Sequence, residues 1–234
     1  LGDPSQFAHS PFDSLATNPV IGVGPNAGGQ FGWRKGGKRN TSGRGGRGDG
    51  AGTQPAVDRA LTWLSRHQSP DGSWDCDGFS SQCKGNRCDG HGEAPYDPGV
   101  TGLALLPFLG AGETHVQGEH RDVVKRGLGY LRAIQDAEGC FGPRTDGHFT
   151  YNHAIGALAM AEAYGMTGSP LFRGSAQKAL DFIALSRNPY FAWRYGVKPG
   201  DNDTSVTGWA VMVLKSAKMA ELNVDAPDEF CATA

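Results

Sequence analysis

One short segment of the chain concentrates side chains that bind metals or form disulfides. Cys76, Cys83, Cys88 and His91 lie within 16 residues of one another. Three thiolates and an imidazole can bind zinc as a Cys3His site, so zinc is one expectation. The intervals differ from those of standard zinc fingers. A loop closed by a Cys83–Cys88 disulfide, with the third cysteine free or paired with Cys140, is the favoured alternative, and free thiols are the third.

Two neighbouring patterns also suggest chemistry. The stretch from His67 to Asp75 combines a histidine, carboxylates, an amide and a tryptophan in HQSPDGSWD. The stretch Asp75-Cys-Asp77-Gly78 resembles the start of a calcium-binding loop, but Lys84 occupies the place of the closing glutamate. Whether these residues form a site or a structural joint depends on the elements around them.

The composition favours one folded domain after a glycine-rich tail. Residues up to Gln54 contain six Lys/Arg and three Asp, whereas the remainder contains 16 Lys/Arg and 21 Asp/Glu. The acidic body argues against nucleic-acid binding, and no apolar run reaches the roughly 18–20 residues of a membrane span. We expect residues 1–52 to form a disordered linker and residues 53–228 to form the domain. The compartment stays open, and disulfides would favour one outside the cytoplasm.

Six segments of the domain have helical patterns. Three of them carry one apolar face, at Val57/Leu61/Leu64, Val124/Leu128/Leu131 and Ala176/Leu180/Ile183. Thr53, followed by Pro55, is the expected N-cap of the first. The other three, residues 100–106, 155–161 and 206–212, are apolar on nearly every side, so we expect them to be covered on both sides.

The two kinds of helix alternate in an internal repeat, at about 55–112, 120–168 and 174–222. The joints between them align at Gln68/Gly72/Trp74, Gln135/Gly139/Phe141 and the degenerate Arg187/Phe191/Trp193. The apolar helices begin at the equivalent residues Asp97, Asn152 and Asp203. Repeated helix pairs form a superhelix or a ring, and the fully apolar inner helices favour a ring.

These repeats resemble the terpenoid-cyclase and protein-prenyltransferase family. The QW motif of that family, Gln-x3-Gly-x-Trp, matches residues 68–74 and, with Phe for Trp, residues 135–141. Residues 63–74, 105–112, 161–168 and 203–209 look most similar to a bacterial branch of prenyltransferase/squalene-oxidase repeat proteins. The resemblance implies an all-α fold, an α/α toroid of outer and inner helix hairpins around a central cavity. With about three hairpins, we expect an incomplete ring.

The resemblance also suggests where a catalytic acid would lie. Class II cyclases carry an Asp-x-Asp-Asp motif whose middle Asp protonates an alkene or epoxide. In the matching register Asn202 replaces that Asp, and an amide cannot supply the proton. A shifted register leaves Asp201 and Asp203 as weak catalytic candidates, whereas a helix N-cap at Asp203 or Thr204 is the favoured alternative. Whether the chain is an enzyme stays open.

Protein prenyltransferases bind zinc at the starts of inner helices, which suggests a second metal hypothesis. His153 matches their histidine, but Asp203 stands in place of their cysteine, and zinc prefers N and S ligands. The inner-helix starts still predict a polar rim that binds a ligand. Its candidate residues are Asp97, His153, Asp203, Thr204 and Trp209.

The expected function is a non-catalytic toroid that binds a hydrophobic isoprenoid ligand or an extended peptide in its central groove. The alternatives are a squalene-hopene-cyclase-like isomerase whose acid lies outside this chain, and a zinc-dependent prenyl transferase. Inner-helix aromatics are few (Phe108, Tyr164 and Trp209), whereas carbocation chemistry depends on cation–π partners, so binding is favoured. An incomplete ring exposes apolar surface, so further repeats or self-association are expected partners.

Overall fold

The structure, a computed structural model, describes residues 50–85, 87–145, 147–189 and 191–224. The predicted linker up to residue 49 and the predicted end of the domain, 225–228, lie outside this range. The described residues form six α-helices and two short 3-10 helices, with one isolated bridge between Gln135 and Phe141. The all-α prediction is confirmed. Within the same residues, no helix has the length and hydropathy needed to cross a bilayer.

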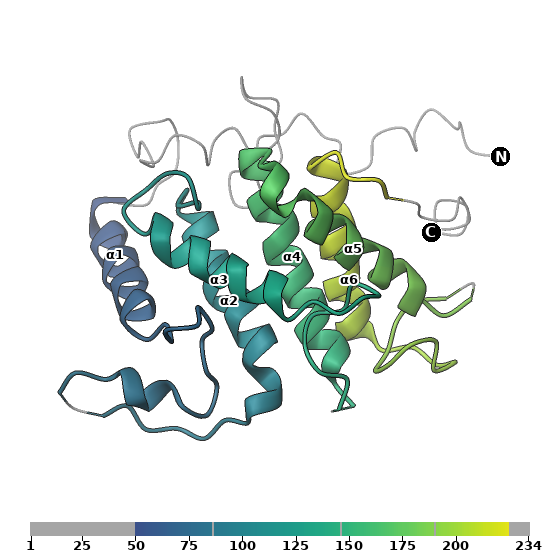
Figure 1. Cartoon of the computed structure of the whole chain (residues 1–234), viewed down its shortest axis with the longest axis horizontal. Coiled ribbons are helices and arrows are strands. Elements are labelled where there is room, and N and C mark those ends of the chain that lie inside the picture. Colours follow the sequence, from purple (N-terminus) through teal and green to yellow (C-terminus); the bar gives the residue numbers. More distant parts are fainter. Residues whose placement is uncertain (1–49, 86, 146, 190, 225–234) are drawn as a thin grey trace.

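The helices form hairpins of one outer and one inner helix, arranged side by side from α1 to α6 (Figure 1). The outer helices are α1 (Gly50–Arg66), α3 (Arg121–Ala133) and α5 (Pro170–Ser186). The inner helices are α2 (Asp97–Gly110), α4 (Phe149–Thr167) and α6 (Thr204–Met219). The short helices η2 (Phe79–Gln82) and η3 (Ala94–Tyr96) lie in the long connection between α1 and α2. All six helices predicted from the pattern are present.

The first helix begins earlier than predicted. Gly50 is already helical, so Thr53 lies inside α1 instead of capping it. Pro55, which lacks a backbone N–H, is therefore also inside the helix and not at its first position. The glycine-rich composition of residues 50–52 concealed this extra turn.

Helix α4 is the centre of the domain. Its residues from Asn152 to Ala163 are all buried, between α2 on one side and α6 on the other. The helices approach closely at glycines: a Cβ on Gly102 of α2 would lie 2.9 Å from the backbone nitrogen of Gly156. Glycines in α2 and α4 therefore permit the close packing of these two helices, whereas a Cβ on Gly208 of α6 would meet no atom within 4 Å.

Full coverage of the inner helices holds for α4 but not for its two neighbours. Leu103 of α2 is 45% exposed, and Val211 and Met212 of α6 are 40% and 42% exposed. The prediction was wrong for these two helices, because each packs on α4 from one side only. They leave apolar side chains at the surface on both flanks of the central helix.

The QW joints fasten each hairpin to the next outer helix. The amide nitrogen of Gln68 donates to the carbonyl of Gly72 (3.0 Å) and to that of Val123 in α3 (2.9 Å). Gln135 repeats this pattern, with the carbonyls of Gly139 and of Ser175 in α5, both at 3.0 Å. The side-chain oxygen of Gln68 in turn accepts hydrogen bonds from Nε and Nη2 of Arg126.

The aromatic residue of each joint packs into the core between the helices. The indole N–H of Trp74 donates to the carbonyl of Leu64 at 2.9 Å, and that of Trp193 to the carbonyl of Ile183 at 2.7 Å. Phe141 is equally buried but has no such donor. The histidine–tryptophan stretch HQSPDGSWD is thus, from Gln68 to Trp74, a structural joint that recurs along the fold.

Candidate functional site

Asp97 is the first residue of α2 and accepts a hydrogen bond from the segment that precedes the helix. Its Oδ1 accepts a hydrogen bond from the backbone N–H of Cys76 at 2.7 Å. Partial burial raises the pKa of this carboxyl, the Cys76 N–H opposes the rise, and the charges of Asp75 and Asp77 add to it. The carboxylates of Asp75, Asp77 and Asp97 offer oxygens within 4.8 Å of one another. Oxygens of this kind are calcium ligands, and Asp97 supplies the third carboxylate that the sequence spacing did not indicate.

His153 is part of the core and not of a polar rim. Its Nδ1 accepts from the backbone N–H of Phe141 at 3.2 Å, and its Nε2 lies 3.0 Å from the carbonyl oxygen of Ala179. Since that oxygen accepts only, the proton is on Nε2 and both ring nitrogens are used. Complete burial lowers the pKa of His153 to about 4. His153 therefore cannot bind zinc or a ligand in this arrangement, which corrects its assignment to the rim.

In the other two joints, a threonine accepts the hydrogen bond that His153 accepts in the middle joint. The N–H of Trp74 donates to Thr101 Oγ1 at 2.9 Å, and that of Trp193 donates to Thr207 Oγ1 at 3.2 Å. In the middle repeat, Gly156 stands at the position of these threonines. His153 supplies the acceptor from one turn earlier, so its role is structural.

Asp203 is the N-cap of α6. Its Oδ1 accepts from the backbone N–H of Val206 at 2.8 Å, as the favoured alternative anticipated. Thr204 follows it as an exposed first helical residue, and Trp209 packs, half-buried, against the core. Asp201 is exposed and pairs with Arg194 at 2.8 Å. The two carboxylates therefore have structural roles in the described residues, one in an ion pair and one in a helix cap.

Removal of the Asp203 carboxylate should cost stability. We expect Asp203→Ala to lower the free energy of unfolding by about 1 kcal/mol, because an N-cap bond to α6 is lost. Asp201→Ala is the matched control and should cost less than about 0.5 kcal/mol, because its ion pair is exposed. Urea unfolding monitored by circular dichroism measures both. Equal losses would contradict the capping role.

The cysteine loop brings together a different set of ligands from the one predicted. Cys83 Sγ lies 3.4 Å and Cys88 Sγ 3.5 Å from Nε2 of His67. The three ligand atoms all lie within 4.8 Å of one another. His67, which directly follows α1, was not among the predicted ligands, and Cys76 and His91 are not part of the cluster. The Cys3His expectation is corrected to a Cys2His cluster.

The imidazole of His67 is positioned by its other nitrogen. Nδ1 lies 2.7 Å from the carbonyl oxygen of Trp63, so it carries the proton and leaves the lone pair of Nε2 toward the thiols. The indole of Trp63 stacks on the imidazole, with 3.9 Å between ring centroids. Hydrogen bonds from Cys88, followed by the contact with His67, lower the pKa of Cys83, and the Cys83 thiol raises the pKa of Cys88.

An open cavity of about 390 Å³ borders the cluster. It is lined by the three ligand residues and by Trp63, Arg66, Gln82 and Lys84. The cations of Arg66 and Lys84 make this cavity suitable for an anion, since opposite charge is favoured in a partly desolvated recess.

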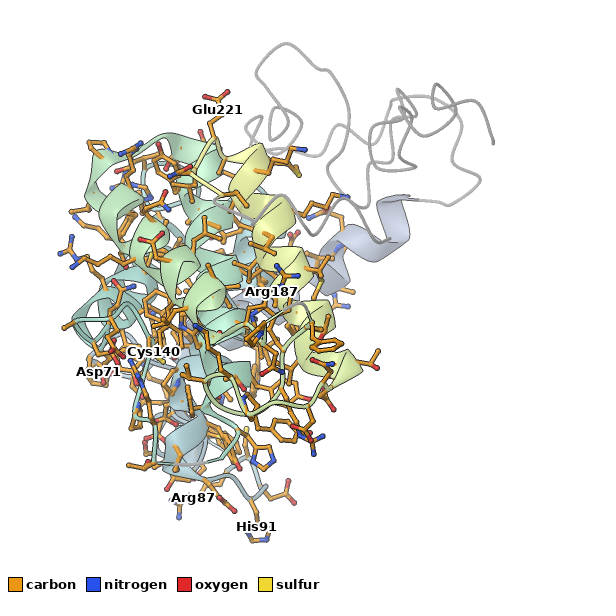
Figure 2. All side chains as sticks on the ribbon, turned by 90° about the vertical axis from the view of Figure 1, so that its right-hand side faces the viewer. Asp71, Arg87, His91, Cys140, Arg187 and Glu221 are labelled. Carbon is orange, nitrogen blue, oxygen red and sulfur yellow. The ribbon has the colours of Figure 1, made fainter. Side chains whose placement is uncertain are left out.

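Cys76, Cys140 and His91 are not part of this cluster. Cys76, Cys83, Cys88 and Cys140 are all free thiols in the described structure, so the expected Cys83–Cys88 disulfide is absent there. Cys140 is buried against Phe149 and Phe182, and burial raises the pKa of its thiol to about 12. Figure 2 shows His91 near Arg87 at the end of the molecule, well separated from Cys140. A disulfide between Cys140 and a loop cysteine is likewise absent, because Cys140 is a free thiol in the described structure.

Comparison with known proteins agrees with the fold. A family model described as the squalene-hopene cyclase C-terminal domain matches residues 48–152. The chain is also 28% identical over 182 residues to a squalene–hopene cyclase of Bradyrhizobium diazoefficiens, an alignment that covers 71% of this chain and 26% of the relative. The chain thus spans about a quarter of the length of that relative. The two matches support a terpenoid-cyclase-like family.

Proposed function

We propose, from the similarity to squalene–hopene cyclases, that this domain binds a hydrophobic ligand of the isoprenoid class on its inner helices without being the proton donor of a cyclisation. The observation that supports the absence of a proton donor is the environment of Asn202, the residue that aligns with the catalytic acid of the cyclases. Its Oδ1 accepts from the backbone N–H of Ala192 at 3.1 Å and from Nδ2 of Asn188 at 3.2 Å. The amide stabilises the third joint.

The neighbouring carboxylates do not substitute for this acid. Protonation of an alkene needs a strong acid that is shielded from water. Asp201 is exposed and paired with Arg194, and Asp203 accepts the N-cap hydrogen bond of α6. An isomerase reaction would therefore need an acid other than these two carboxylates.

The exposed apolar residues of the inner helices support binding. Leu103 lies on the side of α2 opposite Leu105, which packs in the core next to Gly127 of α3. Met212 is exposed in the same way on α6. We assign the ligand-binding face to these exposed apolar side chains of the two helices that flank α4. Phe108 does not contribute an aromatic ring to this face, because it is fully buried beside Trp74.

Zinc-dependent prenyl transfer at the inner-helix starts is not favoured. It would need His153 as a ligand, but both nitrogens of that imidazole are occupied by backbone groups. The Cys2His cluster lies instead between the end of α1 and the loop that follows it.

The test uses farnesol, a short isoprenoid alcohol, at low micromolar concentration in equilibrium dialysis with the full chain. We expect saturable binding that Leu103→Gln and Met212→Gln each weaken by roughly 10-fold, because burial of one such side chain is worth about 1.5–3 kcal/mol. Leu171→Gln is the matched control, since Leu171 is 46% exposed on the outer helix α5. Equal loss in the control would contradict binding on the inner helices.

Incubation with squalene tests the second half of the proposal. We expect gas chromatography to find no cyclised product above the level without protein. A cyclised product that persists in Asn202→Ala but disappears in Asp203→Asn would overturn the assignment of Asp203 as a cap alone.

A further inference from the structure

We propose that His67, Cys83 and Cys88 form a zinc site with three protein ligands and a fourth position open to the adjacent cavity. The site joins the end of α1 to the long connection before α2, and it is independent of the inner-helix face. Its donors are two thiols and one imidazole, the combination that favours zinc over calcium or magnesium.

The distances fit a tetrahedral ion. Zinc bonds of about 2.3 Å to sulfur and 2.0–2.1 Å to nitrogen separate the two donor atoms by about 3.5 Å at a tetrahedral angle. The Sγ atoms of Cys83 and Cys88 lie 3.4 and 3.5 Å from His67 Nε2. The remaining sulfur–sulfur separation is within 4.8 Å, whereas the ion needs about 3.8 Å, so a small movement of the loop completes the set.

The histidine is already oriented as a ligand. Metal-bound histidines almost always donate their second ring N–H to a carboxylate, a carbonyl or water, which fixes the tautomer. Nδ1 of His67 makes this bond to the Trp63 carbonyl at 2.7 Å, and the stacked indole fixes the ring plane. The side chain is buried, at 6% exposure, with its free nitrogen toward the thiols.

The fourth position distinguishes this site from a closed structural one. Structural zinc sites have four protein ligands, whereas sites with three keep one position for water or a ligand. Cys76 and His91, the further candidates in the loop, are outside the cluster. The three ligand residues instead line the cavity that Arg66 and Lys84 also line. The fourth ligand is therefore water, hydroxide or a small anion.

Zinc titration of the full chain tests the ligand set. The protein, stripped with a chelator and kept reduced with a phosphine, is titrated with zinc in competition with a chromophoric chelator. We expect one zinc per chain. His67→Ala, Cys83→Ser and Cys88→Ser should each weaken zinc binding by at least about 100-fold. Loss of a residue that only hydrogen-bonds to a metal ligand typically weakens binding by about 10–100-fold.

The matched controls are Cys76→Ser, His91→Ala and Cys140→Ser, which should bind zinc within about 3-fold of the unmodified chain. Three results would overturn the site: no zinc bound, an equal loss in Cys76→Ser or His91→Ala, or purification with a Cys83–Cys88 disulfide and no affinity for zinc after reduction. Circular dichroism of each variant shows whether the helices are retained. Because Cys83 and Cys88 are in the loop, their serine variants should remain folded.

Cobalt substitution tests the open position. Cobalt in the site should show sulfur-to-metal charge-transfer absorption that Cys88→Ser reduces. Addition of azide should shift the visible d–d bands, because an anion replaces water as the fourth ligand. Bands that do not respond to azide would show that the fourth position is closed.

Discussion

Lowering the pH from about 6.5 to about 4 is expected to remove about 3 kcal/mol of folding stability through one side chain, His153. Burial lowers the pKa of this imidazole from 6.5 to about 4 in the folded protein. Each pKa unit corresponds to about 1.4 kcal/mol. The buried ring accepts one backbone hydrogen bond and donates another, and protonation would remove the acceptor.

The direction of this stability change follows from the protons that the folded and the unfolded chain bind. Above pH 6.5 the imidazole is neutral in both states and its contribution to stability is complete. Between 6.5 and 4 the unfolded chain binds a proton that the folded chain does not, so stability falls as the pH falls. His115 adds to this slope, because burial also lowers its pKa.

Urea unfolding of the unmodified chain and of His153→Gln between pH 7.5 and 4 measures the effect. The variant should be less stable at pH 7.5 by about 1–3 kcal/mol, since one backbone group loses its partner. Its stability should then depend much less on pH. His91→Gln, at an exposed position, should keep the original slope. Parallel slopes for His153→Gln and the unmodified chain would contradict the buried neutral imidazole.

The second large effect is expected at the turn glycine of the middle joint. Gly139→Ala should destabilise the protein by at least about 3 kcal/mol. The residue has φ of +100°, which side chains other than glycine rarely adopt, and an added Cβ would lie 2.1 Å from the carbonyl oxygen of Lys178 in α5. The Lys178 carbonyl is part of the backbone of α5 and cannot shift without disturbing that helix. Backbone strain and steric overlap therefore both contribute to the loss of stability.

Gly129→Ala provides the matched control for this substitution. Gly129 lies inside α3, and an added Cβ would meet no atom within 4 Å. The control should therefore stabilise the chain by about 0.4–1 kcal/mol. Thermal unfolding of both variants should show shifts of opposite sign. A loss in Gly139→Ala no larger than about 1 kcal/mol would indicate that the turn and α5 separate easily.

The repeat predicted most of the fold because its signals are local. Apolar periods identified all six helices, and the spacing from Gln135 to Phe141 identified the joint. The start of α1 was missed because glycine-rich sequence has low helix propensity. The exposed side of α2, with Leu103, was missed because apolar composition alone does not show how many neighbours a helix has.

The candidate sites were predicted less well, because they depend on contacts between distant residues. His67 was assigned to the joint because it precedes Gln68, yet its ring faces Cys83 and Cys88, 16 and 21 residues further on. Its position after a helix that ends beside the cysteine loop was the available signal. His153 was matched to a zinc ligand by its place at a helix start, and its burial became visible only with α5 packed on it.

The QW joints also make the stability of each turn depend on the hairpin that follows it in the chain. Gln68 binds a carbonyl in α3, and Gln135 binds one in α5, so each turn is completed by the outer helix that comes after it in the chain. Loss of α5 would release the turn before α4, whereas loss of α1 would leave that turn intact. Unfolding should therefore spread backward from the C-terminal hairpin, and amide hydrogen exchange should be faster at Gly139 than at Gly72 when the last hairpin opens.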